Sequence, residues 1–354
     1  MRPSEARKAS PPGPTPRELG YAMPAEWAPQ ETVWLAWPHD PLTFPGRIPQ
    51  VETIYHQAIR ALTRNGRVDL LVSNADERQR VEAWASREGV GNLRLHDVPV
   101  ADVWIRDYGP TFVRGPRGVA MVDWLFNAWG DKYPTLRPDG VVPRLLAPKL
   151  GVPRFEPQVV MEGGSFDVNG EGAVLTTEQC LLHENRNPHL SRERIEGVLR
   201  DFLGAETVLW LGEGVVGDDT DGHVDDVARF VAPDTVLACM EEDPHHPNHA
   251  ILAENGKRLS SMRDPRGRPF KLVPLPMPGD VLDDEGEPLP ASYANFLVAN
   301  GVVLLPVFGH ANDERAVRTL EACFPDRAVV PLRCEDMVHG MGTLHCASQQ
   351  QPAA

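Results

Sequence analysis

The chain has 354 residues, of which 42% are hydrophobic and 24% are charged, and its formal net charge is −15. This composition is typical of a globular protein, and the acidic excess argues against nucleic-acid and anionic-membrane partners, which bind clustered Lys and Arg. The longest apolar stretch, residues 296–308, is interrupted by Asn300, Gly301 and Pro306 and is shorter than the roughly 20 residues that span a bilayer. We therefore expect no membrane-spanning segment.

The first 18 residues are rich in Pro and Gly and have few apolar side chains. We expect residues 1–18 to form a disordered Pro-rich tail and residues 19–352 to form a single domain. No apolar stretch follows the charged start, as a secretory signal would require, so the default expectation is a cytoplasmic protein. The five cysteines are scattered and include no Cys-x-x-Cys pair, which predicts reduced thiols.

Short strand-like runs alternate with helical patterns after the tail, which indicates an α/β fold. A strand over Val68–Val72 is followed by a helix over Asp76–Trp84 and a strand over Leu93–His96. Later strand and helix pairs join Ala173–Thr177 to a helix from Ser191, Val236–Met240 to a helix from Pro247, and Val302–Val307 to a helix from Asn312. A shorter helix fits residues 143–151.

These five helix starts are spaced roughly 50–65 residues apart, which favours a repeated supersecondary unit arranged in a ring. Five unrelated units in one open sheet remain the alternative. Asn74 and Asn312 precede two of the helices. We expect both to be N-caps, because a side-chain oxygen can accept the free N–H groups of a first helical turn.

Four segments gather acidic, His, Gly and Trp residues in apolar surroundings, as functional loops do. In residues 102–112, Trp104, Arg106 and Asp107 stand at a turn after a strand-like run, with a structural Arg–Asp pair beside a core Trp as the alternative. In residues 161–167, Glu162 precedes two glycines, which either let a ligand approach the backbone closely or only form a turn.

The third segment, residues 217–226, holds five aspartates and one histidine. It lacks the closing Glu of an EF-hand calcium loop. If the segment is a strand, His223 and Asp225 face one side, because residues two apart in a strand share a face; a solvated acidic loop is the alternative. In the fourth segment, residues 339–352, glycines precede Cys346, a candidate nucleophile in its thiolate form.

The other four cysteines are expected to be structural. Cys239 falls in a predicted strand and Cys323 in a predicted helix, where small buried thiols are common. Cys180 and Cys334 have no motif of acidic, His and Gly residues around them.

The run His245-His246-Pro247-Asn248-His249 resembles a cluster of metal ligands. Pro247 interrupts it and no second cluster has suitable spacing, so a surface loop is favoured over a metal site.

With these segments in order, the sequence resembles the agmatine deiminase family, part of a wider group of guanidine-modifying enzymes that includes bacterial peptidylarginine deiminases. The resemblance covers most of residues 19–352. It rests on seven motifs in the family's order: Gly20–Trp27, Trp104–Phe112, Glu162–Ser165, Asn185–Pro188, Asp221–Asp225, Ser292–Phe296, and His345–Cys346 followed by Gln349–Pro352.

The resemblance implies a five-bladed α/β propeller of the pentein type, built from pseudo-repeated ββαβ units around a central cleft. It implies hydrolysis of agmatine to N-carbamoylputrescine and ammonia, a step of putrescine synthesis, through a thiouronium intermediate on a cysteine and without a metal or organic cofactor. It also implies a homo-oligomer, in family habit a dimer.

Carried over residue by residue, Cys346 is similar to the family's nucleophile and His223 to its general acid and base. Asp107 and Asp225 match the carboxylates that hold the guanidinium, and Glu162 matches a further acid beside them. These roles suit the chemistry, because a planar guanidinium offers its N–H donors in a fixed fork that carboxylates accept.

The chain departs from the family pattern near the substrate. The family's Gly-Gly-Gly-Asn-Ile-His-Cys is replaced here by Gly-Met-Gly-Thr-Leu-His-Cys over residues 340–346, and Tyr108 replaces a Thr. Gly342 in this loop is a candidate substrate-binding residue. Trp104 and Asp219 are candidates for the far end of the substrate, where an aromatic face and a charge would meet an alkylammonium group.

Several alternatives stay open at this point. A peptidylarginine deiminase, or another guanidine hydrolase of the same family, would use the same residues. An amidinotransferase would use the same nucleophile but would have to exclude water. A non-catalytic binding module on the same fold belongs to another class, because fold does not fix function.

Overall fold

The computed structural model describes residues 13–354, which form a mixed α/β fold with five sheets. Each sheet contains an antiparallel pair of strands, and a helical connection leads from the second of these to a third strand parallel to it. Parallel neighbours need such a crossover, whereas antiparallel neighbours need only a turn. The same ββαβ unit therefore occurs five times, in agreement with the repeat predicted from the sequence.

Four units follow one another along the chain. Their elements are β4 (Thr111–Gly115), β5 (Gly118–Val122), α4 (Ala128–Asp131), η2 (Pro134–Val141), α5 (Val142–Leu150) and β6 (Arg154–Phe155); β7 (Phe166–Val168), β8 (Ala173–Thr177), α6 (Glu178–Leu181), α7 (Arg192–Leu203) and β9 (Thr207–Leu211); β10 (Ala228–Ala232), β11 (Thr235–Met240), α8 (Pro247–Ser261) and β12 (Lys271–Pro276); and β13 (Leu297–Ala299), β14 (Val302–Val307), α9 (Asp313–Cys323) and β15 (Ala328–Arg333).

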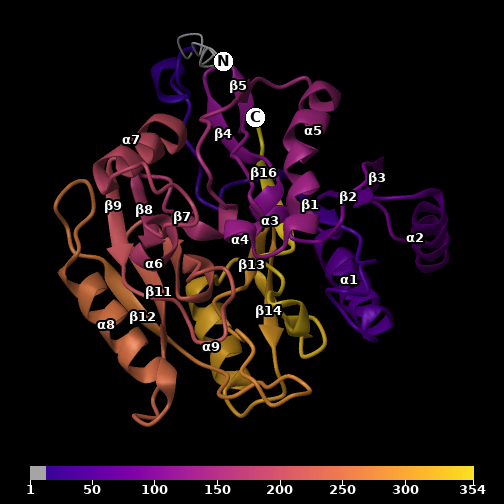
Figure 1. The fold of residues 1–354 in the computed structure, drawn as a ribbon. Helices are drawn as coiled ribbons and strands as arrows, with labels where there is room; N and C mark the ends of the chain where they lie inside the picture. The colour runs from indigo at the N-terminus through magenta and orange to yellow at the C-terminus, as the bar shows by residue number, and fades with distance from the viewer. Residues whose placement is uncertain (1–12) are drawn as a thin grey trace, which may run out of the picture.

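The fifth unit joins the two ends of the described chain. Its strand β16 (Ser348–Pro352) pairs antiparallel with β1 (Gln30–Ala36), and α1 (Ile48–Leu62) leads to the parallel strand β2 (Val68–Val72). A further helix, α2 (Ala75–Glu88), adds a fourth strand, β3 (Leu93–Asp97), to this sheet alone. The first and last strands thus lie side by side (Figure 1).

The predicted helices exist, but one of them was matched to the wrong place in the repeat. The helix from Asp76 is α2, which serves the additional strand, whereas the unit's own crossover helix is α1. The Asn74 side chain caps α2 by accepting the N–H of Glu77 at 2.9 Å. The cap predicted for Asn312 is wrong, because its backbone is already helical and its side chain donates to the carbonyl of Met277.

The core lies around the central strands β2, β8 and β14, whose residues are all buried. The tail predicted for residues 1–18 falls partly outside the described residues. Its described end includes the start of a 3₁₀ helix, η1 (Arg17–Leu19), and Arg17 donates to the carbonyl of Ala205 at 3.3 Å. Within residues 13–354, no helix has the length and apolar character needed to cross a membrane.

Short helical turns precede the first strands of several units. They are α3 (Ile105–Tyr108), η3 (Gly163–Ser165) and η4 (Val224–Asp226), and another turn, η5 (Val338–Gly340), lies near the C-terminus. The strand predicted around His223 is therefore wrong, because His223 precedes η4 and β10 begins only at Ala228. Likewise Asp107 lies in α3, before a strand rather than after one. Figure 1 shows α3 near the middle of the molecule, with α1, α5, α7 and α8 towards its edge.

Candidate active site

Each ββαβ unit begins with an irregular segment directly before its first strand, and each of these five segments carries a polar residue of the site. The residues are Asp107 before β4, Glu162 before β7, His223 and Asp225 before β10, Asn295 before β13 and Cys346 before β16. Residues far apart in sequence therefore occupy one position of a repeated structure.

Direct contacts join these segments. The Gly164 N–H donates to Asp107 at 2.9 Å, and His223 Nδ1 lies 3.8 Å from the same carboxylate. The Asn295 amide donates to the Cys346 sulfur at 3.0 Å. A Cβ added to Gly164 would lie 2.5 Å from His223 Nδ1, so this glycine is required for the close approach.

A cavity of about 280 Å³ leads to this cluster, and four of the eight predicted site residues line it: Trp104, Asp107, Asp219 and Cys346. The other predicted acids and the histidine are buried behind its wall: His223 contacts Asp107, Asp225 contacts Cys346, and Glu162 contacts His223. Gly342 packs between the Trp104 ring and the sulfur, because a Cβ there would lie 2.8 Å from Trp104 and 3.2 Å from Sγ. All eight predicted residues therefore line the cavity or support its wall.

The Cys346 thiol lies between an amide donor and a carboxylate. Asp225 Oδ2 is 3.7 Å from its sulfur, on which Asn295 also converges. Burial, followed by the charges of Asp225, Asp226 and Asp107, raises the pKa of Cys346 well above its usual range. The free site therefore favours a neutral thiol, and a bound cation would favour the thiolate.

Asp225 is held ionised by the histidine next to the nucleophile. His345 Nδ1 lies 2.7 Å from Asp225 Oδ2, and its Nε2 lies 2.9 Å from Glu26, which Arg229 also binds. Burial opposes the charge on Asp225, but the hydrogen bond and charge of His345 outweigh it and lower the pKa of Asp225. The second oxygen of Asp225, Oδ1, has no hydrogen-bond partner among the described residues and is free to accept a ligand N–H.

Asp107 is fixed by two donors. The Trp129 indole N–H and the Gly164 backbone N–H each donate to one of its oxygens at 2.9 Å. Burial has the largest effect on the pKa of Asp107 and raises it, as do the charges of Asp225 and Glu162. His223 lowers this pKa but is outweighed, so the pKa of Asp107 is raised to about 6. This carboxylate can hold a cation near neutral pH.

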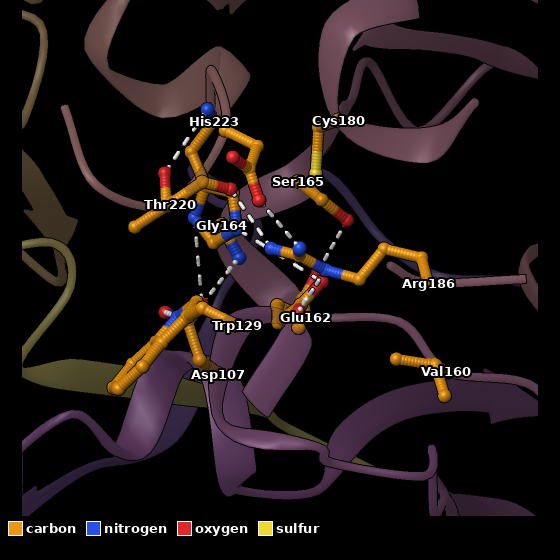
Figure 2. Close-up of polar contacts among 12 residues, drawn as sticks. Asp107, Trp129, Val160, Glu162, Gly164, Ser165, Cys180, Arg186, Thr220 and His223 are labelled. Atoms are coloured by element: carbon orange, nitrogen blue, oxygen red, sulfur yellow. Dashed lines mark hydrogen bonds and ion pairs between the residues drawn. The ribbon is translucent and has the colours of Figure 1, made fainter. Parts of the chain in front are cut away.

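His223 lies among carboxylates (Figure 2). Its Nε2 is 4.0 Å from Glu162 Oε2, and the other Glu162 oxygen accepts from Arg186 at 2.7 Å. Burial opposes its protonation, but Asp107, the Cys180 thiol and Asp225 raise the pKa of His223 well above its usual value. A protonated imidazole here can act as a proton donor.

The mouth of the cavity is less enclosed. Leu42 is 83% exposed and Tyr133 is 39% exposed, and the Tyr133 hydroxyl donates to Asp219 at 2.5 Å. Burial, then the charge of Asp218, raises the pKa of Asp219 to about 6 against the hydrogen bond from Tyr133. Asp219 can therefore carry a negative charge at the far end of the cavity near neutral pH.

Sequence reasoning assigned no role to four polar residues of the site: Glu26, Arg186, Asn295 and His345. All four lie inside motifs that supported the family resemblance, which was the available signal. Cys180, which has no such motif around it in the sequence, gains acidic and His neighbours in the fold, because a ligand atom of Cys180 lies within 4.8 Å of those of Glu162 and His223. The repeat brings these residues together from separate motifs.

Within the described chain, two buried groups hold potential metal-ligand atoms within 4.8 Å of one another: Glu162, Cys180 and His223, and Asp225, Asp226 and Cys346. The histidine run over residues 245–249 belongs to neither group. Instead, His246 caps α8 by accepting the N–H of Asn248, and His249 contacts the carbonyl of Glu241.

Comparisons with known proteins agree with this geometry. A family model described as Porphyromonas-type peptidyl-arginine deiminase matches residues 22–352. The agmatine deiminase of Ectopseudomonas mendocina is 38% identical over 96% of this chain and 97% of its own. The structure of Enterococcus faecalis agmatine deiminase is similar with a TM-score of 0.88 and 35% identity, over 96% of this chain and 98% of that one. A cysteine-to-serine variant of C. jejuni agmatine deiminase with substrate bound gives a TM-score of 0.85 and 28% identity, over 94% and 96% of the two chains.

Proposed function

Because the chain belongs to the Porphyromonas-type peptidyl-arginine deiminase family, we propose that it is an agmatine deiminase, which hydrolyses agmatine to N-carbamoylputrescine and ammonia. The observation that carries this choice of substrate is the charge of the cavity wall. Asp40, Asp102, Asp107 and Asp219 line it, whereas no Lys or Arg of the described chain does. Agmatine carries a cation at each end and no carboxylate, so it matches this wall better than free arginine does.

The two ends of the cavity suit the two ends of the substrate. Asp107 and the free oxygen of Asp225 accept N–H groups of the guanidinium, which places its carbon near the Cys346 sulfur. The alkylammonium group lies towards Asp219 and the Trp104 ring, which offer a carboxylate and an aromatic face.

The first half of the reaction removes ammonia. The bound cation favours loss of the Cys346 proton to solvent, and the thiolate attacks the guanidinium carbon, which gives a neutral tetrahedral adduct. Protonated His223 gives its proton to one amino group. The C–N bond then breaks, ammonia leaves, and a cationic thiouronium remains on the sulfur.

The second half adds water. Neutral His223 takes a proton from water while the water oxygen bonds to the thiouronium carbon. The C–S bond breaks, the thiolate leaves, and the hydroxyl proton is lost to give the ureido product. Glu162, fixed by Arg186, orients His223 for both steps.

We also propose that residues 19–352 form one catalytic domain, with the five units arranged as a five-bladed propeller. The contacts between units support a ring. The Asn295 amide donates to Asp226 and to Cys346, and the backbone N–H of Arg106 donates to the carbonyl of Cys346 at 3.1 Å, which links the fifth unit to the first of the other four. The homodimer and the cytoplasmic location stay predictions.

The test is release of ammonia and ureido product from agmatine, free arginine and a blocked arginyl peptide, assayed in parallel. We expect turnover of agmatine to exceed that of the other two by at least about 30-fold, since a misplaced or unpaired charge costs roughly 2–5 kcal/mol. Faster turnover of the peptide would reject agmatine as the substrate and favour a peptidyl-arginine deiminase.

Cys346→Ser is the control for the nucleophile, because it preserves the size of the side chain but not the thiolate. We expect it to fold and to release no ammonia above background. Ammonia release near the wild-type rate would show that Cys346 is not the nucleophile.

A further inference from the structure

Cys180 takes no part in the proposed reaction, yet it lies beside the catalytic histidine. It follows β8 in the short helix α6, and its side chain is fully buried. A ligand atom of Cys180 lies within 4.8 Å of ligand atoms of both Glu162 and His223, and Figure 2 shows these three side chains in one cluster. A thiol, a carboxylate and an imidazole are a typical set of zinc ligands.

The polar atoms of this cluster have unused binding capacity. His223 Nε2 and Glu162 Oε2 are buried and have no hydrogen-bond partner anywhere in residues 13–354. They lie 4.0 Å apart, which is too far for a hydrogen bond. Zinc binds nitrogen and carboxylate oxygen at about 2.0–2.2 Å, so an ion between the two atoms would reach both with little movement.

We propose that Cys180, Glu162 and His223 bind a thiophilic divalent metal ion, with Zn²⁺ as the best match, and that this ion inhibits the enzyme. The ligand atoms are Cys180 Sγ, Glu162 Oε2 and His223 Nε2. Binding releases the protons of the thiol and of Nε2 to solvent, so that a thiolate and a carboxylate balance the charge of the ion. Arg186 stabilises the arrangement by holding the other oxygen of Glu162 at 2.7 Å.

The second group of potential ligands, Asp225, Asp226 and Cys346, is a weaker candidate. Asn295 already donates to the Cys346 sulfur and to Asp226, and His345 is hydrogen-bonded to Asp225 Oδ2, so that Asp225 Oδ1 is the buried oxygen of this group without a hydrogen-bond partner. A metal ion bound to the sulfur would have to break the contact with Asn295, whereas the Cys180 cluster has two ligand atoms without hydrogen-bond partners.

An ion has a short route to the Cys180 cluster. The cavity reaches Asp107 and Thr220, and both contact His223: Asp107 at 3.8 Å and Thr220 by accepting its backbone N–H at 3.2 Å. One layer of side chains therefore separates the cavity from His223.

Inhibition follows from the role of His223, so this part of the inference rests on the proposed function. With Nε2 bound to the ion, the ring cannot take the doubly protonated form that donates a proton to the leaving ammonia. Metal binding itself does not depend on that role, and it has a separate readout.

The first experiment measures binding without turnover. Cd²⁺, a spectroscopic substitute for Zn²⁺, is titrated into Cys346→Ala until equilibrium, and the ultraviolet absorption of cadmium bound to thiolate is recorded. We expect the absorption to saturate at a single ion per chain and to vanish when Cys180→Ala is added to Cys346→Ala. Cys180→Ser, which preserves side-chain size, repeats the test if the alanine variant does not fold.

The second experiment measures inhibition of agmatine turnover by Zn²⁺, each variant being compared with its own rate in chelator. We expect Cys180→Ala to require at least about tenfold more Zn²⁺ than the wild type for half-inhibition. His249→Ala is the matched control, since it removes a histidine from the surface run and should leave inhibition unchanged.

Two results would overturn the proposal. If Cys346→Ala shows no cadmium absorption while Cys180→Ala retains it, the metal binds at the nucleophile. If neither variant shows it, the cluster binds no ion. If the wild type does not turn over agmatine but Cys346→Ala still shows the cadmium absorption, the proposed function is rejected and the metal site is supported.

Discussion

The floor of the cavity is the part around Asp107, Asp225 and Cys346, and its mouth is the part around Tyr133 and Asp219. The two regions differ in how firmly their polar groups are held. At the floor, Asp107 accepts two fixed donors and Asp225 is paired with His345, and all three side chains are buried. At the mouth, Asp219 has the hydroxyl of a part-exposed tyrosine as its side-chain donor. The floor is therefore organised before substrate arrives, which suits the reacting guanidinium, whereas the mouth suits selection among substrate tails.

After loss of the Cys346 nucleophile itself, the largest expected effect on activity comes from removing a charge at the floor. Asp107→Asn and Asp225→Asn each replace a charge-assisted contact worth roughly 1.5–3 kcal/mol, so we expect kcat/KM to fall roughly 10- to 150-fold. Steady-state kinetics with agmatine measures this.

Asp226→Asn is the matched control for the floor. Burial, then the charges of Asp225 and Asp218, raises the pKa of Asp226 well above its usual range, which favours its neutral form in the free site. The asparagine can still accept the hydrogen bond from Asn295. An effect of Asp226→Asn as large as those of the other two variants would contradict this account of the site.

The next largest loss of activity is expected from adding a methyl group to the closely packed floor. In Gly342→Ala the new methyl group would lie 2.8 Å from the Trp104 ring and 3.2 Å from the Cys346 sulfur. Overpacking of this kind costs roughly 1–3 kcal/mol, so we expect kcat to fall roughly 5- to 150-fold. Gly256→Ala in α8, where nothing lies within 4 Å of the added Cβ, should leave kcat unchanged.

A smaller effect is expected at the mouth. Asp219→Asn removes a part-exposed charge worth roughly 0.5–1 kcal/mol, so KM for agmatine should rise roughly two- to fivefold with little change in kcat. Because the pKa of Asp219 is about 6, the difference in KM should be present at pH 8 and shrink below pH 6. A large fall in kcat instead would place Asp219 at the chemistry.

The smallest effect on turnover is expected from Asp102→Asn. This substitution should instead change how the free energy of unfolding depends on pH. Burial raises the pKa of Asp102 to about 7 from 3.8, the value expected in the unfolded chain. The folded state thus favours the protonated acid, and its stabilisation is complete below pH 3.8 and is lost as the pH rises towards 7.

The asparagine mimics the protonated form at every pH. Relative to the wild type, the free energy of unfolding of Asp102→Asn should therefore increase by roughly 1–3 kcal/mol between pH 5 and pH 8. Urea denaturation at the two pH values measures this. An equal pH dependence in both proteins would show that Asp102 does not titrate in this way.

The sequence alone indicated which residues line or support the cavity and which elements form. The runs Val68–Val72, Ala173–Thr177 and Val302–Val307 are the strands β2, β8 and β14 with the same bounds. Their largely apolar character is a local property, and it fits central strands that are buried on both faces. The eight predicted site residues came from segments rich in acidic, His, Gly and Trp residues, and their roles came from the family resemblance that the ordered motifs carry.

The tertiary structure decided how these residues meet. His223 and Asp225 approach each other through a 3₁₀ turn and not along a strand, and Cys180 lies beside His223 without any motif to indicate it. The partners of Asp225 and Cys346, His345 and Asn295, could not be assigned from sequence. These contacts form because the starts of the five units meet, and such long-range packing is set by how whole sheets fit together rather than by any local pattern.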